Sequence, residues 1–267
     1  SYTFRSVEGN HFYEFEVELN GLPDSSLTLF DIDGEQLMTN DDSNELASKL
    51  IRRSTGDGVM RLDVGATVAL FNGHDGEWQA DVTVATKRNG ILTCTAQSKP
   101  LQLPPDLWLL FAPIKKARTD FIVEKATEMG AARILPVQTD YTNADRIRQD
   151  KLQVHALEAT EQCGGTFVPE VAGITRLDKV LDGWDAARRL MFCDEAMLGA
   201  ASVLSADLKG PWAILIGPEG GFSDTERTRL HGLDFAHPVS LGPRILRADT
   251  AAVAALTVWQ QALGDWV

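Results

Sequence analysis

The amino-acid sequence predicts a small β-rich domain followed by an α/β domain whose strands and helices alternate along the chain. Residues 1–98 contain many short segments in which apolar and polar residues alternate, separated by turn residues, which is typical of a small barrel. Residues 106–267 alternate short apolar segments with helical ones, the pattern of an α/β fold. Residues 99–105 are rich in proline, so we interpret them as a linker between the two domains.

Short-range patterns predict the elements of the first domain. Phe15 to Leu19 alternates apolar and acidic residues, as a half-buried strand does. Residues 29–35 resemble a hairpin with an Asp-Gly turn, and residues 68–73 and 78–84 indicate two further strands around a glycine-containing turn. The stretch from Asn44 to Arg53 has helical spacing, so one helix is expected among these strands.

The second domain begins with an unbroken apolar segment at 107–112, as expected for a strand covered on both faces. The helix predicted at 120–129 places four apolar residues on one face, and Gly130 is suited to end it. That face consists of Phe121, Ile122, Ala126 and Met129. Further strands are expected at 134–137, 190–193, 213–216 and 239–241, and further helices at 151–162 and 248–263. The last helix is rich in alanine, so we expect it to pack closely in its own domain or on a second copy of the chain.

The formal net charge of −13 restricts how this chain of 267 residues can bind nucleic acid. Affinity for phosphate backbones comes from Lys and Arg, which release counterions on binding. A nucleic-acid partner therefore requires a local basic patch. One candidate patch is Lys115, Lys116, Arg118 and Lys125, and another is Arg244 with Arg247. The alternative is that both are ordinary solvated surface charge.

The three cysteines, Cys94, Cys163 and Cys193, are widely separated. Their spacing fits neither a zinc site nor a disulfide framework, which suits a reducing compartment. Cys163 or Cys193 is either a nucleophile or, in the simpler interpretation, a structural thiol. The first residues lack the features of a signal peptide, and no apolar run has the length of a membrane span. We therefore expect a cytoplasmic protein with no metal and no membrane partner.

Two glycine-containing loops carry the strongest functional signal. The first, ILIGPEGGFSDTER, begins at Ile214. It lacks the lysine of a phosphate-binding P-loop and the G-x-G-x-x-G of a dinucleotide loop, and it leads into a capping box at Ser223. Taken alone it is either a structural turn or a place where backbone approaches a ligand. The second, LGPRILR, follows a strand from Leu241, and two such loops together predict a ligand crevice at the carboxyl ends of the strands.

Three motifs in order, KKARTDFIVEKATEMG, IGPEGGFS and LGPRILRADTAA, closely resemble those of SPOUT-class methyltransferases of the RsmE type. The resemblance extends from about residue 59 to the C-terminus, and residues 1–58 are atypical. It implies a SPOUT-type knotted α/β methyltransferase domain preceded by a PUA-like β-barrel that contacts RNA. It also implies a homodimer that uses S-adenosylmethionine to methylate N3 of a uridine in small-subunit ribosomal RNA.

Carried onto this sequence, the resemblance assigns three groups of site residues. The catalytic candidates are Arg247, Arg118 and Glu219, and the RNA-binding candidates are Lys115, Lys116, Arg118, Lys125 and Arg244. The cofactor-binding candidates are Phe192, Leu215, Ile216, Gly217, Gly220, Gly221, Leu241, Gly242, Ile245, Leu246 and Thr250.

Three residues depart from the family pattern on the surface expected to face RNA. Asp140 and Tyr141 stand where basic residues are common, and Gly165 stands where an arginine is typical. The loss of positive charge predicts weak binding to naked RNA and a preference for an assembled ribosomal particle. The alternative function is a non-catalytic RNA-binding or ribosome assembly factor on the same fold. A nucleotide-dependent α/β enzyme is disfavoured by the missing phosphate lysine.

Overall fold

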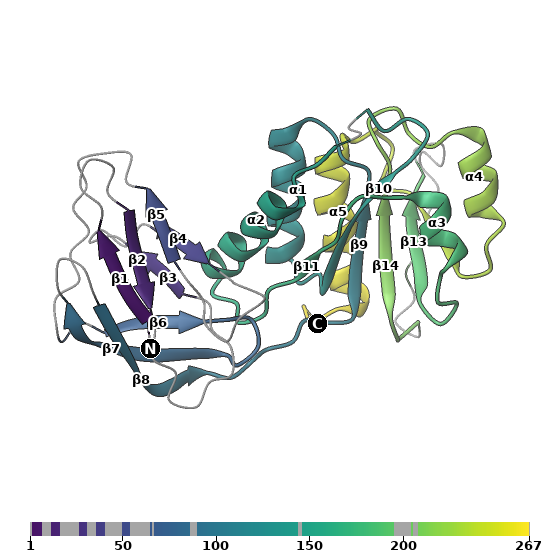
Figure 1. Ribbon diagram of the computed structural model, residues 1–267. Helices are drawn as coiled ribbons and strands as arrows, with labels where there is room; N and C mark the ends of the chain where they lie inside the picture. Colours follow the sequence, from purple (N-terminus) through teal and green to yellow (C-terminus); the bar gives the residue numbers. More distant parts are fainter. Residues whose placement is uncertain are drawn as a thin grey trace. The chain divides into compact units, whose positions relative to one another are not determined.

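The structure is a computed structural model, which describes residues 2–6, 12–16, 27–30, 36–40, 50–53, 65, 67–85, 90–143, 146–194, 204 and 208–266. For the five segments before residue 54 only the backbone is described. The chain divides into two compact units. The N-terminal unit comprises Ser1–Leu103 and Gly164–Val168, and the C-terminal unit comprises Pro104–Cys163 and Pro169–Val267 (Figure 1).

The described strands of the N-terminal unit form three antiparallel sheets. β8 lies close to β1 and β2, and β6 lies close to β3, so the sheets pack on one another. The sheets consist of β1 (Tyr2–Ser6), β2 (Phe12–Glu16) and β5 (Leu50–Arg53); of β3 (Leu27–Phe30) and β4 (Gln36–Asn40); and of β6 (Thr67–Phe71), β7 (Glu77–Ala85) and β8 (Gly90–Lys99).

The hairpin predicted at 29–35 is confirmed by the antiparallel pairing of β3 with β4, in which Phe30 lies opposite Gln36. Its turn lies outside the described residues. The helix predicted over Asn44–Arg53 is wrong for Leu50–Arg53, which is β5 and pairs with β2; residues 44–49 lie outside the described residues. The spacing of apolar residues within a ten-residue segment does not show whether a distant strand pairs with it. Here the pairing with β2 overrides the local helical spacing. Of the strand expected at Phe15–Leu19, Phe15 and Glu16 lie in β2, and residues 17–19 lie outside the described residues.

The described strands of the C-terminal unit form one sheet of seven strands in which every pairing is parallel. This confirms the α/β sheet that the sequence predicted. The order is β11-β10-β9-β14-β13-β15, and β12 also pairs with β10. The strands are β9 (Leu107–Phe111), β10 (Arg133–Gln138), β11 (Glu170–Val171), β12 (Thr175–Arg176), β13 (Arg189–Cys193), β14 (Trp212–Ile216) and β15 (Ala236–Val239).

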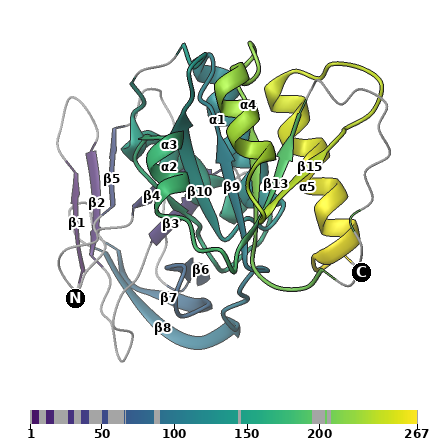
Figure 2. The same cartoon turned by 90° about the vertical axis from the view of Figure 1, so that its right-hand side faces the viewer.

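Helices cover both faces of this sheet (Figures 1 and 2). One group is α1 (Lys116–Glu128), α2 (Gln149–Gln162) and α5 (Ala248–Leu263), in which α1 packs on α2 and α5, and α5 packs on β14. The other is α3 (Leu177–Asp182) and α4 (Asp224–His231), whose apolar residues share a core with alternate residues of β9, β13 and β14. All five residues of β14 are buried, which explains its uniformly apolar sequence.

Most predicted elements of this unit are confirmed, with two corrections. The last strand was expected at 239–241 but is β15, which ends at Val239. It is an edge strand, where Pro238 is tolerated. Phe121 was expected in the buried face of α1 but is 38% exposed, with Lys125 Nζ 5.5 Å from its ring centroid. The helix begins at Lys116, and its buried residues are Thr119, Ile122, Val123, Ala126 and Thr127.

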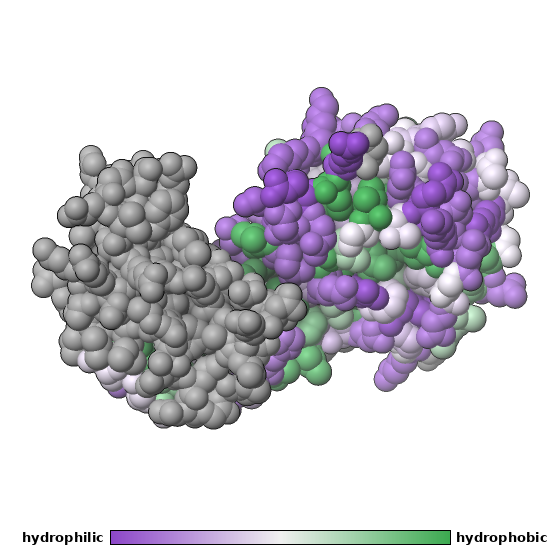
Figure 3. Space-filling model, viewed as in Figure 1, coloured by the Kyte–Doolittle hydropathy of each residue, from purple (hydrophilic) through white to green (hydrophobic). Residues whose placement is uncertain are grey.

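Gly130 ends α1 with a positive φ of 77°, as predicted. No helix in the described part of the chain is both long and apolar enough to cross a membrane. On the face drawn in Figure 3, hydrophilic side chains cover much of the C-terminal unit and surround smaller hydrophobic areas.

Candidate active site

A pocket of about 230 Å³ lies at the carboxyl ends of β13, β14 and β15 and at the start of α5. These strands are neighbours in the sheet, so the loops that follow them meet at one edge, where open α/β sheets bind ligands. We call the stretch from Gly217 to Gly221 the first loop and the stretch from Ser240 to Arg247 the second loop. The lining residues are Cys193, Asp194, Ile216, Gly217, Pro218, Glu219, Gly221, Val239, Ser240, Leu241, Gly242, Arg244, Ile245, Leu246, Arg247, Ala248 and Ala251.

The first loop needs glycine at two positions for two different reasons. Gly221 has a φ of 72°, and its N–H donates a hydrogen bond to the Pro218 carbonyl at 2.9 Å, which closes a tight turn. A Cβ at Gly217 would lie 3.1 Å from the Phe222 ring, so a larger residue would push the loop and the ring apart. The backbone therefore comes close to the pocket without side chains in the way.

The capping box predicted at Ser223 is confirmed. The Ser223 hydroxyl accepts a hydrogen bond from the Glu226 N–H at 3.2 Å, and the Ser223 N–H donates to Glu226 Oε2 at 3.0 Å. These bonds satisfy amides at the start of α4 that have no partner within the helix. They also fix the point at which the first loop ends.

The second loop turns at Gly242, which has a φ of 111°. The Gly242 N–H lies 3.4 Å from Ser240 Oγ, and the loop ends at Arg247, the residue that precedes α5. Ile245 is 73% exposed although it is a large apolar residue at the pocket. An exposed isoleucine beside a cavity is a surface that a ligand can cover.

Seven of the predicted cofactor-binding residues line the pocket: Ile216, Gly217, Gly221, Leu241, Gly242, Ile245 and Leu246. Phe192 and Leu215 are fully buried in the core shared with α3 and α4. Because side chains alternate across a strand, their neighbours Cys193 and Ile216 face the pocket instead. Thr250 is exposed and bonds locally to Asp249. Gly220 lies on the side of the first loop that meets Tyr141.

The predicted catalytic residues Arg118 and Glu219 form an ion pair with each other. Arg118 Nη1 lies 2.7 Å from Glu219 Oε1, and Arg118 Nε lies 3.6 Å from Asp249 Oδ2. The guanidinium thus connects α1, the first loop and the start of α5. The pair is partly exposed, with side chains 30% and 46% accessible, so its contribution to folding stability is small.

The other basic candidates fall into two classes. Lys116 pairs with Asp120 at 2.6 Å, and Lys125 pairs with Glu128 at 2.5 Å. Among these basic candidates, Lys115, Arg244 and Arg247 have exposed side chains that make no hydrogen bond or ion pair with any described residue. Arg244 and Arg247 both line the pocket, so they are the cations available to a ligand there.

Sequence reasoning missed the buried carboxylate of Asp194, which lines the pocket directly after β13. Arg227 Nε donates to it at 3.1 Å, and His231 Nε2 lies 2.9 Å from its second oxygen. Both partners lie on α4, so this cluster ties the helix to the end of β13. An acid after an apolar strand was the signal that could have identified it.

Desolvation raises the pKa of the Cys193 thiol to about 12. The thiol is therefore protonated at neutral pH, and a protonated thiol is a poor nucleophile. Of the two interpretations of Cys193, the structure supports the structural thiol. Among the described residues, no group of three or more His, Cys, Asp or Glu side chains is arranged to hold a metal ion.

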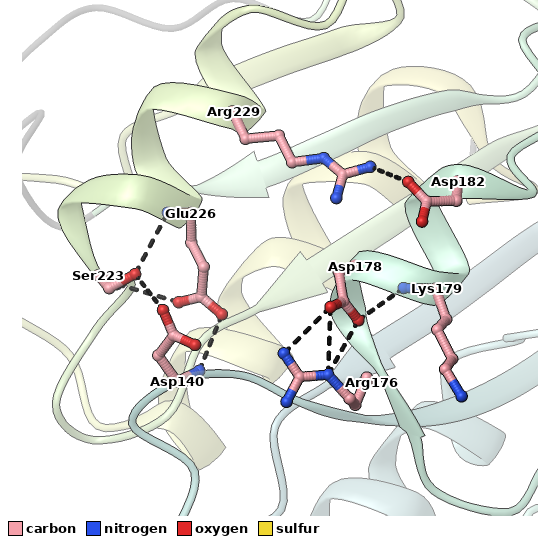
Figure 4. Close-up of polar contacts among 8 residues, drawn as sticks. All are labelled: Asp140, Arg176, Asp178, Lys179, Asp182, Ser223, Glu226 and Arg229. Atoms are coloured by element: carbon pink, nitrogen blue, oxygen red, sulfur yellow. Dashed lines mark hydrogen bonds and ion pairs between the residues drawn. The ribbon is translucent and has the colours of Figure 1, made fainter.

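The loop after β10 is fastened to the start of α4 by Asp140 (Figure 4). Ser223 Oγ donates to Asp140 Oδ2 at 2.6 Å, and the Asp140 N–H donates to Glu226 Oε1 at 2.9 Å. Asp140 therefore extends the capping box with a third residue from a distant part of the chain. Arg229 of α4 also reaches Asp182 of α3 at 2.6 Å, so the helix that follows the first loop is held at both ends.

Two family models match the chain. The model described as RNA methyltransferase domain matches residues 101–260, and the model described as RNA methyltransferase PUA domain matches residues 59–93. The chain is 30% identical over 205 residues to the ribosomal RNA small subunit methyltransferase E of Synechocystis, which covers 74% of this chain and 67% of that protein. It is 29% identical over 205 residues to the protein of the same name from Rickettsia conorii, covering 74% of this chain and 82% of that one.

Solved structures match over a similar extent. A putative methyltransferase from Legionella pneumophila, in complex with the bound cofactor SAM, has a TM-score of 0.66 at 31% identity and covers 76% of this chain and 86% of its own. A ribosomal RNA small subunit methyltransferase E from Neisseria gonorrhoeae, bound to S-adenosyl methionine, has a TM-score of 0.65 at 26% identity, with coverages of 77% and 87%. The α/β fold with a preceding PUA-like domain is thereby confirmed.

Proposed function

Because this chain belongs to the RNA methyltransferase family, we propose that it transfers a methyl group from S-adenosylmethionine to N3 of a uridine in small-subunit ribosomal RNA. The observation that carries the proposal is the pocket formed by the two glycine loops, with unpaired arginines at its wall. The names of the relatives from Synechocystis and Rickettsia conorii support the substrate class. The bound ligands of the Legionella and Neisseria structures support the cofactor.

The pocket residues fit S-adenosylmethionine. Apolar side chains such as Ile216, Val239 and Leu246 suit the adenine ring and the thioether, while the backbone of the first loop offers hydrogen-bonding groups at its edge. The described lining contains no lysine, which accords with a ligand that carries no phosphate.

Bound S-adenosylmethionine supplies an electrophilic methyl group on a sulfonium. The chain's contribution is first to hold the acceptor base in line with that methyl group. Uracil N3 is normally base-paired, so the uridine must be unpaired or turned out of its stack. Loss of the N3 proton leaves negative charge on the uracil carbonyls. We assign the stabilisation of this charge to Arg247, which lines the pocket and is not paired with any described carboxylate.

The second contribution of the chain is to accept the N3 proton, and Arg118 and Glu219 act together in this step. Glu219 lines the pocket and is the carboxylate proposed to accept the N3 proton. Its ion pair with Arg118 orients it toward the rim of the pocket, and Arg118 is in turn held by Asp249. We therefore assign Arg118 as the residue that positions Glu219, and Lys115 and Arg244 as contacts to RNA phosphates.

The proposal also covers the form of the RNA substrate, the oligomeric state of the protein and its location in the cell. The acidic chain offers few unpaired cations near the pocket, so an assembled small subunit is the proposed substrate rather than free RNA. A homodimer is supported by α5, where Val258 is 39% exposed on a helix otherwise rich in alanine. A cytoplasmic location follows from the proposed substrate.

Calorimetry and turnover test the proposed function in two steps. S-adenosylhomocysteine should bind, whereas ATP and NAD should not. Incubation with tritiated S-adenosylmethionine and methyl-deficient small subunits should then label the RNA. Binding without label would favour the alternative, a non-catalytic assembly factor, and binding of ATP in preference to S-adenosylhomocysteine would contradict the cofactor assignment.

The role of Arg247 is tested by Arg247→Ala. We expect S-adenosylhomocysteine to bind within about twofold of the wild-type affinity, while turnover falls by roughly 10²–10³, the typical cost of removing one group that stabilises developing charge. Arg148→Ala is the control, since Arg148 is an exposed arginine paired with Asp150 away from the pocket. Loss of cofactor binding in Arg247→Ala would show that this arginine holds the cofactor instead.

A further inference from the structure

An exposed aromatic ring lies beside the first loop. Tyr141 follows β10 and is 50% exposed. A Cβ built on Gly220 would lie 3.4 Å from the Tyr141 Cβ and 3.8 Å from two of its ring atoms. Gly220 is flanked by Glu219 and Gly221, which both line the pocket. The ring therefore stands at the edge of the proposed cofactor site, with part of its surface open to solvent.

The turn that carries Tyr141 is held firmly. The Thr139 N–H donates to Thr142 Oγ1 at 2.8 Å, and the Thr142 N–H donates to the Thr139 carbonyl at 3.2 Å. Asp140, between them, is bonded to both Ser223 and Glu226 (Figure 4). An aromatic side chain on such a fixed turn loses little conformational freedom when a ligand covers it.

Packing against Gly220 does not by itself explain why an aromatic residue stands at position 141. A leucine on the same turn would cover the glycine, but only an aromatic ring presents a flat π face. Stacking on such a face is a sequence-tolerant way to hold an unpaired base. It also suits this chain, because stacking does not depend on positive charge, and only Lys115, Arg244 and Arg247 of the basic candidates are unpaired among the described residues.

We propose that Tyr141 binds RNA by stacking against an unpaired base of the strand that carries the methyl acceptor, directly beside the cofactor pocket. The inference rests on the proposed function and adds a substrate contact to it. Asp140 is then a positioning residue, because it acts through the turn and not on the RNA.

The test compares Tyr141→Phe, Tyr141→Leu and Tyr141→Ala with the wild-type protein. Two quantities are measured: the Kd for methyl-deficient small subunits by co-sedimentation, which needs no turnover, and the Kd for S-adenosylhomocysteine by calorimetry. Tyr141→Phe keeps the ring, so its subunit Kd should stay within about twofold of wild type. The leucine and alanine variants should each raise it by roughly 5- to 150-fold, the range of one base–aromatic stack.

Three controls separate stacking from a structural role. The Kd for S-adenosylhomocysteine should be unchanged in all three variants, and Trp266→Ala, which removes another half-exposed aromatic, should change neither Kd. The loss in Tyr141→Ala should persist between about 50 and 200 mM salt, whereas the loss in Arg244→Ala should shrink, because only phosphate contacts release counterions. A subunit Kd of wild-type strength in Tyr141→Leu, or a parallel loss of S-adenosylhomocysteine binding, would overturn the proposal. Failure of the wild-type protein to bind S-adenosylhomocysteine would instead refute the proposed function.

Discussion

The substitution Gly242→Ala tests whether the shape of the second loop holds the cofactor. Gly242 has a φ of 111°, and a Cβ at this position would meet no atom within 4 Å. The cost of alanine is therefore backbone strain alone, about 1–3 kcal/mol for a residue held in a sparsely populated conformation. Gly173→Ala is a matched control, because a Cβ there also meets no atom within 4 Å and Gly173 does not have a positive φ.

The strain in Gly242→Ala must appear in one of two measurements. If the loop keeps its conformation, the free energy of unfolding falls by about 1–3 kcal/mol relative to Gly173→Ala. If the loop relaxes, the ligand has to restore it, and the Kd for S-adenosylhomocysteine rises by roughly 5- to 150-fold, the same energy expressed as affinity. Urea unfolding and calorimetry measure the two quantities. Equal stability and equal affinity in the two glycine variants would refute the role of this loop.

Three further predictions concern groups around the site. Ser223→Ala removes the cap of α4 and the bond to Asp140, and it should lower the free energy of unfolding by about 1–3 kcal/mol in urea. Burial raises the pKa of Cys193 to about 12, so iodoacetamide at pH 8 should label the exposed Cys163 first. Peptide mass spectrometry measures the labelling of each cysteine, and preferential labelling of Cys193 would contradict its assignment as a structural thiol. Burial and the nearby Arg189 lower the pKa of His237 in the folded state. The free energy of unfolding should therefore fall as the pH drops below about 6.5, the pKa of histidine in the unfolded chain. His237→Gln should reduce that fall, which is measured by comparing unfolding midpoints at two pH values.

The fold was largely predictable because its signals are local. The buried strands are continuous apolar runs, and α5 was predicted with the same boundaries that the structure has. The failures came from distant partners. Leu50–Arg53 is a strand because β2 lies beside it. Phe121 is 38% exposed, since α1, which packs on α2 and α5, buries the neighbouring Ile122 and Val123 instead.

The candidate site also has features that the local sequence predicted and features that depend on distant residues. Glycine and proline mark both loops in the sequence, and the resemblance to the family assigned to these loops and the strands before them seven residues that line the pocket. Phe192 is buried whereas its neighbour Cys193 lines the pocket. Which of two alternate residues faces the pocket depends on what covers each face of the sheet, and the local sequence does not show that. The pairing of Arg118 with Glu219, and of Asp140 with Ser223, joins residues far apart in the chain. Such pairs depend on the tertiary structure and leave no local signal.

Identification of the methylated nucleoside tests the central claim most directly. Methyl-deficient small subunits are incubated with the protein and isotopically labelled S-adenosylmethionine, and the RNA is then digested and analysed by mass spectrometry. The proposed function predicts label in 3-methyluridine, and in no other nucleoside, with little label in Arg247→Ala. Label in a different nucleoside, or none from a protein that binds S-adenosylhomocysteine, would contradict it.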